Sequence, residues 1–232
     1  MHKSGKQWGT LGVIGAVLMG LASAAPKSGP TRDSSRVKRI LVLGDSLSAG
    51  LLLKPSEAWP MLLVGKLRDA GLDFEVTNAS RSGDTTSGGL ARLSAQLKRP
   101  IDIFVVELGI NDAWRGIPVD QIQRNLQQII NRVRAVNPRV QVVIAGMQLP
   151  DSGADGYIRD FDQMFTDLVA KNHAALVPYL LQGVGGNPAL NLYDHIHPNA
   201  AGHKVLVENV WAVLEPIARQ VSEQRTTAAK AN

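Results

Sequence analysis

Residues 40–50 read ILVLGDSLSAG, four apolar residues that lead without a break into Gly-Asp-Ser and a run of small residues. A continuous apolar run of this kind is typical of a buried strand in a parallel sheet. Ser46 follows that strand directly. It is therefore either a turn residue, part of a phosphate-binding loop, or a nucleophile held at the edge of a sheet.

The rest of the chain alternates short apolar runs with amphipathic stretches, and this alternation predicts the fold class. In the amphipathic stretches apolar residues recur at helical spacing, whereas the short runs are continuous or alternate as in strands. Strands are expected at 39–43, 73–78, 101–107, 140–145 and, at an edge, 174–178; helices are expected at 57–70, 90–98, 118–136, 157–172 and 199–220. The order predicts an α/β domain with a parallel sheet and helices on both faces.

Both ends of the chain are expected to lie outside this domain. Basic residues, an apolar stretch over 11–21 and Ala22-Ser23-Ala24 are typical of a signal peptide at 1–24; an uncleaved anchor is the alternative. We expect a flexible basic leader at 25–38, the domain at 39–220 and a disordered tail at 221–232. Cleavage would leave a periplasmic or secreted protein with no stable insertion in the membrane.

The composition excludes several classes of protein. The formal net charge of +5 comes from both ends of the chain, since basic and acidic residues nearly balance within 40–220, and no nucleic-acid-binding surface is expected. The chain has no cysteine, which excludes disulfides, thiolate catalysis and cysteine-bound metals. No coherent set of histidine and carboxylate ligands is apparent, so neither a metal nor another cofactor is expected.

A polar cluster near the C-terminus, DHIHPN at 194–199, could activate a serine. A serine hydroxyl needs an imidazole to take its proton, and that imidazole needs an acceptor that holds its tautomer. Asp194 lies three residues before His197, within reach in one turn, so we assign His197 as the base and Asp194 as its partner. His195 is the rival, because it adjoins Asp194 but is expected to point away; His173 and His203 are expected in or at the ends of helices.

Three groups after successive strands could stabilise an oxyanion. They are the backbone N–H of Ser46, the backbone N–H of Gly83, which no Cβ shields, and the side-chain amide of Asn111. Taken singly, Gly83 is equally consistent with a turn, Asn111 with a cap or an Asx-turn, and Asp45 with a cap of the first loop. Together, at one edge of the sheet, they indicate a site beyond the carboxyl ends of the strands.

Four sequence blocks resemble those of the GDSL or SGNH hydrolase superfamily, in the order and spacing of its bacterial periplasmic acyl-CoA thioesterases, lysophospholipases and arylesterases. The blocks are GDSLSAG (44–50), NASRSGDTTSGGLARL (78–93), VVELGINDAWRG (105–116) and DHIHPN (194–199). The resemblance implies a flavodoxin-like three-layer αβα sandwich with a parallel sheet. It also implies that the protein is a carboxylic ester or thioester hydrolase.

Carried over residue by residue, the resemblance implies Ser46 as the nucleophile, Gly83 and Asn111 as oxyanion donors, and Asp194 with His197 as the rest of a triad. The stretch 147–157 corresponds to the region where such enzymes build the wall of the acyl site. The expected substrate is a small acyl ester or thioester, the expected state is a monomer, and contact with lipid is expected to be transient.

Substrate contacts are expected from Asp45, Trp114, Leu149 and Pro150.

Three other functions are weighed against this one. A classical α/β-hydrolase needs glycine where Ser48 stands, and its aspartate lies further from its histidine than Asp194 does. A flavodoxin-like module that binds phosphate or flavin is opposed by Asp45, whose charge would repel phosphate. A deacetylase of cell-wall or polysaccharide O-acetyl groups would use the same triad, and differs by preferring acetate.

Overall fold

The computed structural model describes residues 37–150 and 155–230, and its five strands form one parallel sheet. Their order is β2-β1-β3-β4-β5. The strands are β1 (Lys38–Gly44), β2 (Phe74–Asn78), β3 (Ile103–Glu107), β4 (Gln141–Ala145) and β5 (Ala175–Val177). Lys38 pairs with Phe74, so the last residue of the expected leader belongs to the sheet. The expected signal peptide and most of the leader lie outside the described residues.

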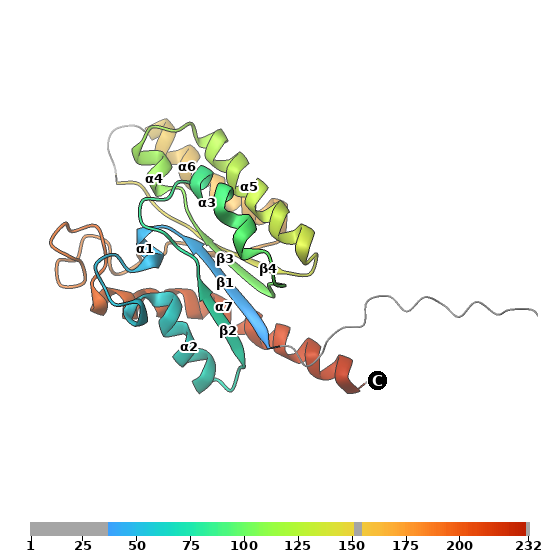
Figure 1. Cartoon of the computed structure of the whole chain (residues 1–232). Coiled ribbons are helices and arrows are strands. Elements are labelled where there is room, and N and C mark those ends of the chain that lie inside the picture. Colours follow the sequence, from blue (N-terminus) through green and yellow to red (C-terminus); the bar gives the residue numbers. More distant parts are fainter. Residues whose placement is uncertain (1–36, 151–154, 231–232) are drawn as a thin grey trace, which may run out of the picture. The chain divides into compact units, whose positions relative to one another are not determined.

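Helices cover the sheet on both faces, which confirms the expected three-layer αβα sandwich (Figure 1). Helices α2 (Trp59–Asp69) and α7 (Ala200–Lys230) pack together on one face. On the other, α5 (Val119–Val136) lies between α3 (Thr86–Arg92) and α6 (Asp155–Asn172). The remaining elements are α1 (Ser46–Ala49), α4 (Ile110–Trp114) and the 3₁₀ turns η1 (Pro55–Glu57) and η2 (Leu93–Gln96).

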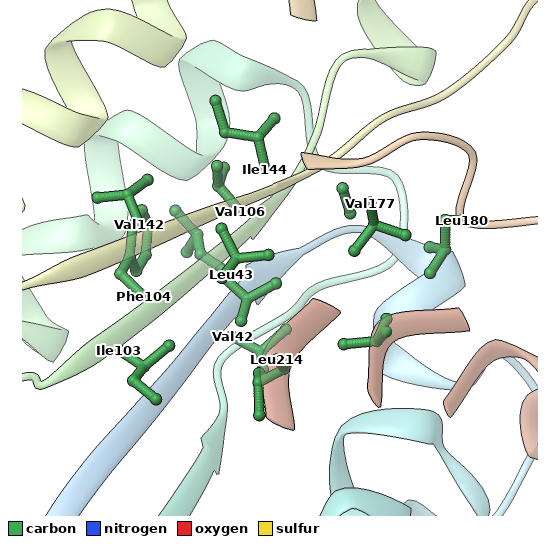
Figure 2. Packing of buried hydrophobic residues seen from close by; sticks show 14 of the residues in the cluster. Val42, Leu43, Ile103, Phe104, Val106, Val142, Ile144, Val177, Leu180 and Leu214 are labelled. Carbon is green, nitrogen blue, oxygen red and sulfur yellow. The ribbon is translucent and has the colours of Figure 1, made fainter. Parts of the chain in front are cut away.

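The core lies between the sheet and these helices, and the sequence pattern explains which residues enter it. Strand β3 is buried along its whole length, as a central parallel strand covered on both faces must be. Helix α5 buries one stripe with helical spacing, formed by Ile122, Leu126, Ile129, Ile130 and Val133. Figure 2 shows part of this core, including Val42 and Leu43 of β1 and Leu214 of α7.

The order in which strands are added to the sheet reverses between β1 and β3. This reversal determines where the site lies. From β1 the chain crosses to β2 at one edge, then returns past β1 to β3, β4 and β5. In such sheets a crevice opens at the carboxyl ends of the two strands where the order reverses. Helix α1, which begins at Ser46, follows β1, and α4, which contains Asn111, follows β3.

The starts of α2 and α3 differ from the predicted ones for local reasons. Helix α2 begins at Trp59 rather than 57, because Pro60 lacks an N–H and is tolerated best in the first turn. Helix α3 begins at Thr86, because the hydroxyl of Thr85 accepts a hydrogen bond from the Gly88 N–H and caps it.

Helix α7 continues to Lys230, so the tail expected to be disordered is helical over 221–230. The helix passes residue 220 because Val221, only 6% exposed, continues the buried face that includes Leu214 and Ala218. None of the helices in residues 37–150 and 155–230 is long and apolar enough to span a membrane.

The start of α7 packs closely against the loop that carries His197. Substitution of Gly202 tests this contact, with Gly65 as a control. A methyl group at Gly202 would lie 2.2 Å from the Leu190 carbonyl oxygen, whereas one at Gly65 in α2 would meet no atom within 4 Å. We expect Gly202→Ala to lower the free energy of unfolding by about 1–3 kcal/mol. Gly65→Ala, the control, is expected to raise it by about 0.5–1 kcal/mol. Urea unfolding measures both, and a Gly202→Ala protein as stable as the wild type would contradict the packing.

Candidate active site

Ser46 is the first residue of α1, where β1 ends. The carboxyl group of Asp45 caps the helix by accepting the Leu47 N–H at 3.0 Å, and Gly50 ends it in the left-handed conformation. This short, capped turn brings the serine hydroxyl to the edge of the sheet. There Ser46 Oγ lies 2.9 Å from His197 Nε2.

His197 is held by Asp194 in the loop before α7. The His197 Nδ1 lies 2.6 Å from Asp194 Oδ2, while Asp194 Oδ1 accepts the backbone N–H groups of Ile196 and His197, each at 3.0 Å. Burial opposes ionisation of this carboxyl, but these hydrogen bonds outweigh it and lower the pKa of Asp194 to about 2. The carboxylate therefore fixes the Nδ1–H tautomer and leaves Nε2 free to accept from the serine hydroxyl.

The three other histidines considered as the base, His173, His195 and His203, lie in different environments. His195 is exposed at the cavity and has a left-handed backbone, with a φ of 58°. His203 is buried in α7, where its Nδ1 accepts the Trp59 N–H at 3.1 Å and burial lowers its pKa to about 4. His173 lies just after α6 with a φ of 46°. The geometry thus selects His197 as the partner of Ser46.

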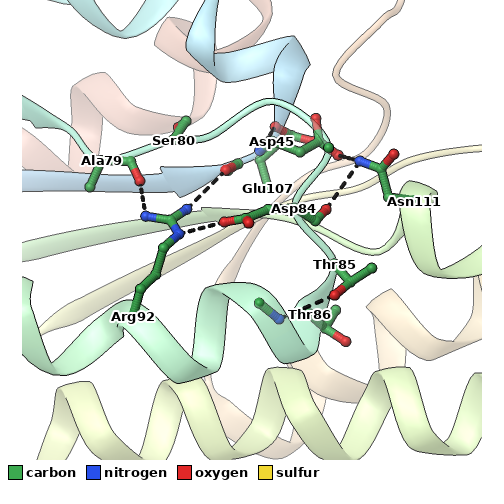
Figure 3. Close-up of polar contacts among 12 residues, drawn as sticks. Asp45, Ala79, Ser80, Asp84, Thr85, Thr86, Arg92, Glu107 and Asn111 are labelled. Atoms are coloured by element: carbon green, nitrogen blue, oxygen red, sulfur yellow. Dashed lines mark hydrogen bonds and ion pairs between the residues drawn. The ribbon is translucent and has the colours of Figure 1, made fainter.

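Asn111 lies across the crevice from α1, and its amide is already engaged. The Asn111 Nδ2 donates to Asp45 Oδ2 at 2.9 Å and to the Asp84 carbonyl oxygen at 3.1 Å (Figure 3). Asn111 also lines the cavity beside Ser46. Because an amide nitrogen carries two protons, one of these hydrogen bonds must break before Nδ2 can donate to a bound oxyanion.

Gly83 is not among the residues that line the cavity. It has a φ of 80° and is exposed at a turn, and its carbonyl oxygen accepts from the Arg115 guanidinium at 3.2 Å. Its left-handed conformation explains the glycine.

Asp45, which was expected to contact substrate, does not line the cavity. Asp45 has no exposed surface, and its two oxygens accept from the Leu47 N–H and the Asn111 amide. It lies beside Glu107, another buried acid, at the end of β3 (Figure 3). Burial raises the pKa of Asp45 to about 6, and burial together with the Asp45 charge raises that of Glu107 well above its usual value.

Arg92 of α3 ties the loops of the site together. Its guanidinium donates to the carbonyl oxygens of Ala79 and Gly44 and pairs with the carboxylate of Asp84 (Figure 3). Ala79 follows β2, Gly44 ends β1, and Asp84 holds Asn111 through its carbonyl. A single cation therefore joins the end of β1 to both ends of the loop between β2 and α3. Its role was not foreseen, because an arginine inside an amphipathic helix carries no distinguishing pattern.

A cavity of about 450 Å³ opens beside Ser46 and His197, with mostly apolar walls. Trp114, Leu149 and Pro150, the other residues expected to contact substrate, line it. Met147 also lines it, within the stretch 147–157 expected to form the acyl wall. Further lining residues that were not predicted are Ile110, Tyr179, Leu181 and Ile196. The only available signal was for Ile196, an apolar residue within the polar cluster at 194–199. Residues 151–154, part of the expected acyl wall, lie outside the described residues.

Among the described residues, no group of three or more His, Asp or Glu side chains is arranged to hold a metal ion.

Comparison with known proteins shows to which family the chain belongs. Residues 42–205 match the GDSL-like Lipase/Acylhydrolase family. The chain is 43% identical to the Esterase TesA of Pseudomonas aeruginosa over 187 residues, 80% of this chain and 92% of that protein. It is 36% identical to the Thioesterase 1/protease 1/lysophospholipase L1 of Escherichia coli K12 over 179 residues, 77% of this chain and 84% of that protein.

The fold agrees with that of a solved relative. A crystal structure of TesA superposes with a TM-score of 0.73 at 42% identity, and the match covers 78% of this chain and 99% of that one. The match therefore extends over almost the whole of a solved enzyme. On its sequence and its fold, the chain belongs to the GDSL-like lipase/acylhydrolase family, and it is an ester hydrolase.

Proposed function

We propose that the protein hydrolyses acyl esters and thioesters through a triad of Ser46, His197 and Asp194. The observation that carries the proposal is the unbroken hydrogen-bonded row from Ser46 Oγ through the imidazole to the Asp194 carboxylate. His197 Nε2 takes the hydroxyl proton while Ser46 Oγ attacks the acyl carbon. The imidazolium that forms is stabilised by Asp194 and returns its proton to the leaving alcohol or thiol. Water then releases the acid by the same steps.

The proposed oxyanion site consists of the Ser46 N–H and the Asn111 amide, which line the cavity, and of the Gly83 N–H, which the family resemblance implies although Gly83 does not line the cavity. The Ser46 N–H lies at the start of α1, where the helix offers unpaired donors. Asn111 would exchange its hydrogen bond to the Asp84 carbonyl, the longer of its two, for one to the oxyanion and keep that to Asp45. Asp45 would then hold the amide in place during the reaction. This exchange stabilises the transition state more than the free enzyme, which is what catalysis requires.

The proposed substrates carry medium to long acyl chains. The cavity has the size of a small-molecule site, about 300–1,000 Å³ in general, and its apolar walls suit a hydrocarbon chain. The names of the two relatives, an esterase and a thioesterase/lysophospholipase, support the same class of acyl substrate. No step of this reaction needs a metal or another cofactor.

Export to the periplasm or the medium is also proposed, on the basic start, the apolar stretch over 11–21 and the Ala22-Ser23-Ala24 sequence. N-terminal sequencing of the protein recovered from a bacterial periplasm tests this proposal. A mature chain that begins at Ala25 is the expected result.

Ser46→Ala tests the nucleophile. Loss of Oγ leaves only binding and the oxyanion donors, so kcat on p-nitrophenyl butyrate is expected to fall about 10⁴-fold or more, with an unchanged unfolding curve. Ser94→Ala, at an exposed position in η2, is the control. A fluorophosphonate should add its mass to the wild-type chain and not to Ser46→Ala. Activity within threefold of the wild type would refute the assignment.

Asn111→Ala tests the oxyanion site. Removal of one oxyanion donor costs about 10²–10³ in kcat in general, and we expect a loss of that size here with little change in KM. Asn131→Ala, on the exposed face of α5, is the matched control. A loss below threefold would remove Asn111 from the site, provided that Ser46 still reacts with the fluorophosphonate.

Trp114→Ala tests the acyl site. Trp114 is half exposed and lines the cavity, so its removal should weaken contact with a long chain but hardly affect acetate. The ratio of kcat/KM for p-nitrophenyl decanoate to that for acetate is expected to fall about tenfold. Val64→Ala, a partly exposed residue of α2, is the control. A wild-type enzyme that prefers acetate would overturn the long-chain proposal and favour a deacetylase.

A further inference from the structure

Glu107 is a buried acid next to the nucleophile that takes no part in the proposed reaction. It is the last residue of β3, has no exposed surface and pairs with Gly44 of β1. One of its oxygens, Oε2, accepts the Ser48 hydroxyl at 2.7 Å and the Asp45 N–H at 3.2 Å. Asp45 and Ser48 lie on either side of Ser46 in the chain. A single carboxyl oxygen therefore holds the nucleophile helix α1 at both ends of its first turn.

Ser48 also connects α1 to α2 and β2. Ser48 Oγ accepts the Trp59 indole N–H at 3.2 Å, and the Ser48 carbonyl oxygen accepts from the Asn78 amide at 2.8 Å. The backbone N–H of Trp59 in turn donates to His203 of α7. Helix α1 has only four residues, too few to be stable alone, so these contacts must determine its orientation.

The space around Glu107 is fitted to its side chain. A methyl group at Gly44 would lie 2.6 Å from Glu107 Oε2 and 2.7 Å from Ser48 Oγ, so the close approach of the strand to the carboxyl group requires a glycine there. The other carboxyl oxygen, Oε1, is buried and has no hydrogen-bond partner among the described residues. An oxygen without a donor is far less costly to bury in a neutral acid than in a carboxylate.

The charged and titratable groups around Glu107 favour its neutral form. Asp45, at the start of α1, is its acidic neighbour, and its own carboxyl group interacts with His197 of the loop before α7. From α3, Arg92 reaches the Gly44 carbonyl but pairs with Asp84. From α7, His203 contacts Trp59 rather than Glu107. Burial and the Asp45 charge both raise the pKa of Glu107.

We propose that Glu107 is a positioning residue which, as an uncharged acid, holds α1 so that the Ser46 hydroxyl faces His197. The inference rests on the proposed function, because it assigns to Glu107 the alignment of that nucleophile. Without the two hydrogen bonds at Oε2, α1 can turn and Ser46 Oγ loses its 2.9 Å contact with His197 Nε2. A displacement of about 1 Å at a reacting atom can cost about 10²-fold in rate.

Three variants separate positioning from mere support of the fold. Glu107→Gln keeps a carbonyl oxygen for both donors and replaces the acidic O–H by an amide, so kcat should stay within about threefold of the wild type. Glu107→Ala removes the acceptor, and kcat should fall about 10- to 100-fold with KM nearly unchanged. Val105→Ala, on the same face of the same strand, is the control for a buried truncation. Its folded fraction should keep the wild-type kcat.

The pH dependence of stability tests the charge of Glu107 without any substrate. A carboxyl whose pKa is higher in the folded state adds stability below its usual pKa, and that stability is lost as the pH rises through the folded value. The free energy of unfolding of the wild type, minus that of Glu107→Gln, should therefore fall from pH 5 to pH 8 in urea titrations. A difference that stays constant or rises would show an ionised Glu107 and overturn the inference.

The kinetic outcomes are equally decisive. A folded Glu107→Ala protein with wild-type kcat, or a Glu107→Gln protein as slow as Glu107→Ala, overturns the proposal. If Glu107→Ala does not fold, Ser48→Ala replaces it, and a wild-type kcat in that variant also overturns the proposal. A wild-type enzyme without esterase activity would instead refute the proposed function. Wild-type activity that does not respond to these variants would refute this inference alone.

Discussion

The site depends on the parallel pairing of β1 with β3, because that register fixes where two loops begin. Gly44 and Glu107 are partners at the carboxyl ends of these strands, and Ser46 and Asn111 follow within a few residues. The backbone ladder places the starts of the two loops side by side, and the side chains of Glu107 and Asn111 then fix them to each other. The strand order reverses at this point in the sheet, which leaves a crevice open at the carboxyl ends of β1 and β3. His197 then needs only to approach from the loop before α7.

Placing so many polar groups at the end of a buried sheet is costly unless each finds a partner. Asp45, Asp84, Glu107 and Arg92 are all buried or nearly so, yet most of their atoms accept or donate hydrogen bonds within the network of Figure 3. Two buried acids, Asp45 and Glu107, lie side by side, and their mutual repulsion favours a proton on one of them. The hydrogen bonds that make burial of these polar groups possible also hold them in place. Loss of one member leaves another polar group unpaired.

The cavity has a different character from the network beneath it. Its walls come from loops after β3, β4 and β5, and most are apolar, whereas the polar groups face it mainly through Ser46, Asn111 and His197. Such a division suits a substrate with one reactive polar bond and a hydrocarbon chain. Helix α1 belongs to both parts of the site. Its first residue, Ser46, lines the cavity, and its third, Ser48, is buried in the polar network.

Local sequence was enough to predict the alternating strands and helices, Ser46 after the first strand, and the pairing of Asp194 with His197, because each depends on neighbouring residues or on hydrophobic period. The boundary of α3 at Thr86 and the extension of α7 beyond residue 220 depended on a cap and on burial against the core, which have weak local signals. The tertiary structure alone decided that Asp45 points inward to Asn111 and that Glu107 lies beside Asp45 and Ser48. These outcomes depend on contacts between residues some 60 positions apart, and the burial that creates them exists only once the sheet has formed.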